Sequence, residues 1–410
     1  MRFRTALCMC FLAIPLISVS AQQTSLYSSS LTSLLTKPLP NAGNGGPTNH
    51  LYSNGDAIAD CALTDCGAIN LLTGSAWNTV SEMQWATPGR NDLGLPVYHS
   101  SKSDPWYRLS CVSAPSLNGI TFQAPNNAQF TQNNVSDEAI AIMDHVHGLI
   151  LEGYVYAKPY YSLGNCSATS AQNACTVRTW TGCSVESIYD ADWASNSNTF
   201  GGYPNNNANP TLISAVAGIV LQKEIMNGVI SHALRLSYHC TNDHNRMVFP
   251  NTSNGGSSAQ LCSSIGVSDT NRPPNGALIF LDYTDKQIAN MQLPTWQNAI
   301  ITAMAHYGGY LDATGPQSLT VGIGNLETGQ AYAYRGTTDP FWAWIASQPG
   351  VRVAGPCSGN CSQYRYQVYP FANIPLVNGT PITAHIHMAD PCVAIAQAGL
   401  TSYEGVAACN

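Results

Sequence analysis

The chain has 410 residues, of which only 10% are charged and 44% are hydrophobic. Without the two arginines among its first four residues it carries 14 basic and 23 acidic residues, a net charge of −9, and it has no basic cluster. These features argue against nucleic acid and anionic membrane surfaces as partners. After residue 21, no segment reaches the run of about 18 apolar residues that a membrane-spanning helix needs.

Residues 1–21 have the layout of a cleaved signal peptide. Two arginines precede an apolar stretch over 6–19, and the small residues Ser20 and Ala21 come before Gln22. A lipoprotein signal fits poorly, because it needs small residues before a cysteine. The segment predicts a secreted protein, extracellular or periplasmic, whose mature form begins near Gln22.

Twelve cysteines follow the signal segment, and an even number in an oxidising compartment predicts six disulfides. Cys61 with Cys66 and Cys357 with Cys361 are interpreted as short bridges. Zinc half-sites are the alternative for both pairs, although neither has the spacing of a C-x-x-C knuckle. The spacing does not define the connectivity.

The remaining chain divides by composition into three parts. Residues 22–60 are rich in Ser, Asn, Gly and Pro without a sustained period, which predicts a low-complexity leader with little structure of its own. Residues 61–349 alternate short apolar runs with polar turns, which predicts a mainly β core, a sandwich or jelly-roll-like pair of sheets with a few short helices. Residues 350–410 predict a Cys-rich extension of that core.

In chain order, the first informative element is a predicted β-hairpin with strands near 137–143 and 148–156. With a two- or four-residue loop, Ala139 faces Glu152, so Asp137 and Glu152 lie diagonally on one face, about 7–8 Å apart. Such a carboxylate pair suits an acid and a base or nucleophile on either side of a glycosidic bond. Ordinary surface acids on a solvated hairpin are the alternative interpretation. Two tyrosines share the predicted face and offer stacking surfaces for sugar rings, Tyr154 and Tyr156.

Helices are predicted later in the chain from their start and stop signals. Thr284 and Gln287 form a capping box for a helix over 285–291. A second helix begins at Pro294, carries apolar residues at helical spacing, and ends at Gly308. The third has its N-cap, its first residue and its stop signal at Asp390, Pro391 and Gly399.

Eight short blocks follow one another over about 210 residues: Asp104-Pro-Trp106, Pro125-x-x-Ala128, Ser136-Asp137, Glu152, Gly228-Val-Ile-Ser-His-Ala-Leu234, Phe249-Pro250, Pro274-Asn-Gly-Ala-Leu-Ile-Phe-Leu-Asp282 and Tyr307-Gly-Gly-Tyr-Leu-Asp312. In this order they resemble a largely uncharacterised family of secreted bacterial β-sandwich proteins, and the resemblance implies a carbohydrate-directed role by analogy. The chain departs from the family pattern at Ala139, where the family has histidine.

The resemblance implies four candidate catalytic positions, Asp137, Glu152, His232 and Asp312. His232 is predicted on a strand face with apolar neighbours, where a hydrogen-bonded core histidine is the commoner role. Arg235 points the other way and is a candidate for binding a substrate carboxylate or for a surface ion pair. Asp312 either orients a catalytic group or caps a turn.

Two further patterns are candidates for binding. Trp342 and Trp344 lie on one face of an extended chain, as a sugar-stacking platform or as core aromatics. The pairs His145/His147 and His385/His387 have the spacing of metal-ligand pairs, with Asp390 near the second, but no third ligand is defined and polar surface histidines are the alternative. No metal and no cofactor are therefore predicted, and the chain lacks the Gly-x-Ser-x-Gly, His-Glu-x-x-His and phosphate-loop motifs.

Together these patterns predict a secreted carbohydrate-active enzyme whose partner is a polysaccharide or oligosaccharide. The first candidate is a glycoside hydrolase with Glu152 as general acid and Asp137 as base or nucleophile. A polysaccharide lyase using His232 or a tyrosine, with Arg235 neutralising a uronate, is the second. A non-catalytic glycan-binding or cell-surface structural protein is the alternative outside enzymes. The sequence does not define an oligomeric state.

Overall fold

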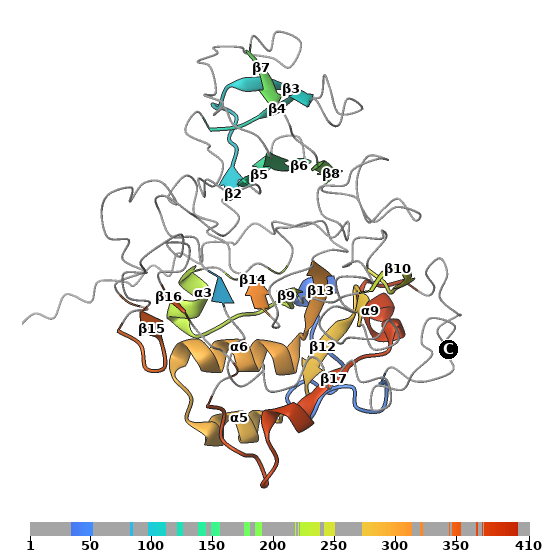
Figure 1. Ribbon diagram of the computed structural model, residues 1–410, viewed down its shortest axis with the longest axis vertical. Coiled ribbons are helices and arrows are strands. Elements are labelled where there is room, and N and C mark those ends of the chain that lie inside the picture. The colour runs from blue at the N-terminus through green and yellow to red at the C-terminus, as the bar shows by residue number, and fades with distance from the viewer. Residues whose placement is uncertain are drawn as a thin grey trace, which may run out of the picture.

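The computed structural model describes 175 of the residues in two groups of elements, both visible in Figure 1. A helix-covered sheet occupies the lower part of the view, and the strands from β2 to β8 lie in the upper part. The described residues are 34–51, 83–84, 97–111, 121–125, 138–144, 149–155, 176–180, 185–190, 218, 220, 222–237, 242–250, 273–313, 320–322, 344, 347–353, 366–367, 371 and 373–400.

The lower part is built on a six-stranded mixed sheet with the order β1-β14-β9-β13-β12-β17. β13 runs parallel to β9 and β1 runs parallel to β14, and the other pairs are antiparallel. β17 is therefore an edge strand that comes from the C-terminal part of the chain. The strands span Met83–Gln84 (β1), Leu234–Ser237 (β9), Leu278–Leu281 (β12), Gly309–Ala313 (β13), Thr320–Gly322 (β14) and Ile386–Met388 (β17).

Both faces of this sheet are covered, as β12 shows most clearly. All four of its residues are buried, because alternate side chains enter two different hydrophobic clusters. Ile279 and Leu281 pack with helices α5 and α6, whereas Leu278 and Phe280 pack with helix α9 and the N-terminal segment. This part is a helix–sheet–helix arrangement rather than the predicted pair of facing sheets. For the chain as a whole, the mainly β sandwich stays a prediction.

The three predicted helices are confirmed, together with their end signals. α5 spans Asp285–Met291 and has the predicted capping box. α6 spans Thr295–His306 and buries one face against the sheet, and α9 spans Pro391–Gln397 behind the Asp390 cap. Cys392 in α9 is disulfide-bonded. The total of six disulfides and the two short bridges, Cys61–Cys66 and Cys357–Cys361, stay predictions. Two shorter helices are α3 over Gln222–Asn227 and the 3-10 helix η5 over Ile382–His385.

The upper part contains a four-stranded sheet, β2-β5-β6-β8, and a three-stranded sheet, β4-β3-β7. The buried carboxylate of Asp144 joins them: it accepts hydrogen bonds from the Ser100 hydroxyl and from the backbone N–H of Gln123. The strands span Val97–His99 (β2), Trp106–Cys111 (β3), Thr121–Gln123 (β4), Glu138–Asp144 (β5), Leu149–Val155 (β6), Thr176–Trp180 (β7) and Val185–Asp190 (β8). Two small pairs lie elsewhere, β10 (Asn242–Met247) with β11 (Pro274–Asn275) and β15 (Arg352–Val353) with β16 (Tyr366–Gln367).

The predicted hairpin is confirmed as β5 and β6, but its predicted register is wrong by two residues. Glu152 pairs with Ala141, and Tyr154 rather than Glu152 pairs with Ala139. The strands extend to Asp144 and Leu149, so the connection is the four residues between them. Asp144 belongs to the strand because its buried carboxylate is satisfied by other elements, a tertiary contact that the local sequence does not reveal.

The N-terminal segment 34–51, which is part of the predicted leader, packs against the folded body. Leu35 and Leu39 are buried against α9 and the sheet. Backbone hydrogen bonds fix the segment to distant elements, from Leu39 N–H to the His306 carbonyl and from Ala233 N–H to the Leu35 carbonyl. It shows no sequence period because it is held by these tertiary contacts rather than by regular structure of its own.

Candidate functional site

A carboxylate lies at the end of the buried strand β12. Asp282 follows Leu281 directly, and its backbone N–H donates to the His385 carbonyl at 3.0 Å, which continues the pairing of β12 with the C-terminal segment. The next residues start α5, so the chain turns away at this point. A polar residue between a buried strand and a capped helix is thereby held at the sheet edge by backbone on both sides.

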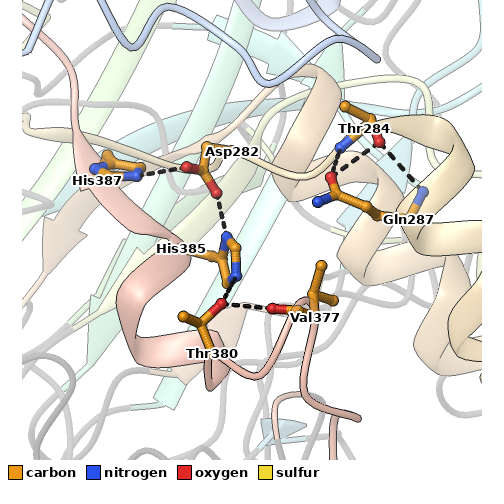
Figure 2. Close-up of polar contacts among 7 residues, drawn as sticks. All are labelled: Asp282, Thr284, Gln287, Val377, Thr380, His385 and His387. Carbon is orange, nitrogen blue, oxygen red and sulfur yellow. Dashed lines mark hydrogen bonds and ion pairs between the residues drawn. The ribbon is translucent and has the colours of Figure 1, made fainter.

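Two histidines from the C-terminal segment share this carboxylate (Figure 2). His385 Nδ1 lies 2.6 Å from Asp282 Oδ1, and His387 Nε2 lies 3.0 Å from Asp282 Oδ2. His385 ends η5 and His387 is the middle residue of β17, between two buried residues. All three side chains are partly buried, with 24%, 13% and 21% of Asp282, His385 and His387 exposed.

Thr380 extends the chain of polar contacts. Its Oγ1 lies 2.9 Å from His385 Nε2 and donates to the Val377 carbonyl (Figure 2). His385 therefore contacts polar groups through both ring nitrogens, the Asp282 carboxylate at Nδ1 and the Thr380 hydroxyl at Nε2.

His387 differs in its contacts. Its Nε2 donates to the carboxylate, and none of the described residues hydrogen-bonds to its Nδ1. The side chain is partly exposed, and an imidazole that a carboxylate orients through one ring nitrogen has the arrangement of a general base.

The surroundings stabilise the charged carboxylate. Burial alone disfavours the charge of Asp282, but the hydrogen bonds and charges of His387 and His385 outweigh it and lower the pKa of this carboxyl. The Tyr283 ring lies 4.4 Å from the His385 ring, and the Phe280 ring lies 5.4 Å from the His387 ring. Burial, together with the charge of Asp282, raises the pKa of Tyr283, so its hydroxyl stays neutral.

His232 lies in a different place and has a different environment from the predicted one. It precedes β9 instead of belonging to it, and only 9% of the residue is exposed. Nδ1 donates to the Ala233 carbonyl at 2.8 Å, and Nε2 lies 3.2 Å from a Glu224 carboxylate oxygen in α3. Burial lowers the pKa of His232, but the hydrogen bond and charge of Glu224 and the backbone contact outweigh it and raise the pKa. Both ring nitrogens have partners, which matches the core role rather than the catalytic one.

Of the predicted carboxylate pair, the structure describes Glu152 but not Asp137. Glu152 lies in β6 between β5 and β8, opposite Ala141 and Ser187. On either neighbouring strand, no acid stands opposite Glu152 or two positions along. Tyr154 is two residues further along β6. Two members of the predicted site lie outside the described residues, Asp137 and Tyr156.

The other predicted residues lie away from Asp282. Arg235 in β9 is level with Tyr310 and Leu278 across the sheet, four residues along β12 from Asp282. Asp312 is the extra residue of a bulge between β13 and β9. Trp344 packs against the main hydrophobic cluster, as a core aromatic does. Trp342 and the pair His145/His147 lie outside the described residues.

Sequence reasoning identified the His385/His387 pair but assigned it the wrong acid. Asp390 caps α9 by accepting from the Cys392 N–H at 2.8 Å. The acid that contacts both histidines is Asp282, which is 103 residues from His385 in sequence, and no spacing signal connects them. Thr380 lies only five residues before His385 and was missed because a turn, which carries no histidine-spacing signal, brings the two together.

The described residues and the comparisons with known proteins add three findings. No group of three or more His, Cys, Asp or Glu side chains in the described ranges could hold a metal ion. None of the helices in this part of the chain has the length and apolarity that crossing a membrane requires. The chain matches no known protein family, no curated protein and no solved structure. The family resemblance therefore stays a prediction.

Proposed function

We propose that this protein is a secreted carbohydrate-active enzyme in which His387 is the general base and Asp282 orients it. The observation that carries the proposal is one carboxylate shared by two imidazoles, with Nε2 of His387 on that carboxylate and no described residue hydrogen-bonded to its Nδ1. His385 and Thr380 are positioning residues, because they act through Asp282. The signal-like N-terminus and the neutral polar composition support an extracellular saccharide as substrate.

An imidazole base favours elimination over hydrolysis of a polysaccharide. In this reaction His387 Nδ1 removes the proton α to the carboxylate of a uronate, a carbon–carbon double bond forms, and the bond to the leaving sugar oxygen breaks. The leaving oxygen takes a proton from solvent, and His387 later returns its proton to solvent, so atoms and charge balance. The reaction class is that of a polysaccharide lyase.

Glycoside hydrolysis is the second candidate, favoured by the position of Glu152. A strand paired on both sides is a rigid support for a catalytic carboxylate. In the observed register no acid stands opposite Glu152, or two positions along, on β5 or β8. The partner acid of Glu152 must therefore come from another part of the chain. If Glu152 is the general acid, Glu152→Gln lowers turnover by about 10²–10⁴-fold.

The experiment is a screen of the oxidised protein against neutral and uronic polysaccharides, with reducing ends and ultraviolet absorbance read together. The proposed elimination yields both signals on a uronic substrate, because the product carries a conjugated double bond. Reducing ends alone support the hydrolase and Glu152. Binding without either signal contradicts both reactions and supports a non-catalytic glycan-binding protein.

A further inference from the structure

The turn that carries Thr380 contains an Asn-Gly pair at its tip. Both Asn378 and Gly379 have positive φ, 52° and 81°, and Val377 and Thr380 exchange backbone hydrogen bonds of 3.0 and 2.9 Å around them. This is a two-residue hairpin loop of the type that favours Asn-Gly. All three residues from Asn378 to Thr380 are exposed.

We infer that Asn378 is a site of spontaneous deamidation, a covalent modification at the border of the Asp282 cluster. The inference does not rest on the proposed function. Succinimide formation needs a backbone amide nitrogen that can reach the asparagine side-chain carbonyl. A following glycine with no steric neighbours meets that need best.

The other described Asn-Gly pairs serve as internal comparisons. The Gly228 N–H donates to Ile225, and the Gly276 N–H donates to Leu311 next to a fully buried Asn275. Gly45 is half-buried, and a Cβ there would lie 3.4 Å from the Asp282 carbonyl oxygen. A Cβ on Gly379 would meet nothing within 4 Å, and no described residue accepts from its N–H. The described pairs begin at Asn44, Asn227, Asn275 and Asn378.

The chemistry needs only water. The Gly379 nitrogen attacks Cγ of Asn378, the C–N bond of the side-chain amide breaks, and ammonia leaves with the proton from the attacking nitrogen. Water then opens the five-membered succinimide at either carbonyl, which gives aspartate or isoaspartate. The attack requires the turn to change its backbone torsions. Val377, which is buried, and Thr380 hold the base of the turn by two backbone hydrogen bonds, so the change involves the exposed two-residue tip.

The isoaspartate product changes the neighbouring contacts. It inserts one extra backbone atom between positions 378 and 379, so a two-residue loop can no longer keep Val377 opposite Thr380. Thr380 Oγ1 is placed by this turn, and it is the contact at His385 Nε2 (Figure 2). The aspartate product keeps the backbone and only adds a negative charge, so the two products have different effects.

The test is peptide mapping of the intact oxidised protein after incubation in mildly alkaline buffer, with separation of the aspartate and isoaspartate peptides. Asn378 is expected to convert at least about tenfold faster than Asn227 and Asn275, because opening a hydrogen-bonded segment at a cost of about 1.4 kcal/mol reduces the reactive population tenfold. Asn378→Gly is the control, since Gly-Gly also suits this turn and cannot deamidate. Asn378→Asp supplies the product with an unmodified backbone.

A second measurement follows the consequence, using the histidine ring signals in an NMR spectrum. The His385 signals should move as isoaspartate accumulates and should stay unchanged in aged Asn378→Gly. Two results overturn the inference. One is conversion at Asn227 or Asn275 before Asn378. The other is an Asn378 that stays unmodified when the chain is unfolded and the same incubation is repeated. Unchanged His385 signals in a fully converted sample overturn the structural consequence.

Discussion

Three carboxylates of the described residues contact histidine, and they differ in burial and in the number of imidazoles that each one holds. The Glu224–His232 pair is almost fully buried, whereas Asp285 and His306 form an exposed pair at 2.6 Å. Among these three, Asp282 alone holds two imidazoles. Partial exposure separates the candidate base from the structural histidine, because a base must reach both its substrate and solvent.

The buried pair predicts a pH-dependent stability. The folded pKa of His232 is raised, so its contribution is complete below the unfolded value of about 6.5 and is lost as pH rises through the folded pKa. His232→Gln should therefore cost about 3 kcal/mol at acidic pH and less at alkaline pH, measured by denaturant unfolding across that range. His306→Gln, at an exposed pair, is the control. A cost that grows as pH rises contradicts the assignment.

The hydroxyl of Tyr283 is buried and has no hydrogen-bond partner among the described residues. Removing an unsatisfied buried hydroxyl while keeping the ring is close to neutral or stabilising. Tyr283→Phe should therefore unfold at the same or a higher temperature and keep the ring contact with His385, observed by NMR. A loss of more than about 1 kcal/mol would mean that this hydroxyl is satisfied.

At the scale of elements, the capping box of α5 fixes the chain immediately after Asp282. Thr284 Oγ1 accepts from the Gln287 N–H at 3.2 Å, and the Gln287 side chain accepts from the Thr284 N–H at 2.7 Å. Thr284→Ala should cost about 1 kcal/mol in the free energy of unfolding, and Thr284→Ser should restore most of it. Equal stability of both variants with the parent would contradict a structural role for the cap.

The sequence predicted elements whose signals are local and missed arrangements that depend on distant contacts. Helix caps at Thr284 and Asp390 are local hydrogen bonds, so α5 and α9 were predicted with their ends. The β5–β6 register was missed by two residues because Asp144, at the end of β5, is anchored by the Gln123 N–H of another sheet. The site was predicted only as the His385/His387 pair, since Asp282 approaches it through the pairing of β12 with β17.

At the scale of the whole molecule, the N-terminal segment closes one face of the sheet. Leu35 is 3% exposed within the cluster that includes α9. Leu35→Ala should cost about 2–5 kcal/mol, measured by thermal or denaturant unfolding. Lys37→Ala is the control, because this side chain is exposed and only its Nζ contacts the chain, at Ala396. If neither variant changes the free energy of unfolding, the segment is not part of the folded body.

The central claim is that the imidazoles on Asp282 form the active group, and a matched pair of variants tests it most directly. Asp282 and Asp285 are three residues apart, and each holds a histidine at 2.6 Å, but only Asp282 orients His387. The measurement is kcat/KM of Asp282→Asn and Asp285→Asn on a polysaccharide that the parent protein cleaves. We predict a loss of about 10²–10⁴-fold for Asp282→Asn and near-parental activity for Asp285→Asn. Equal activity of a folded Asp282→Asn and the parent would contradict the account.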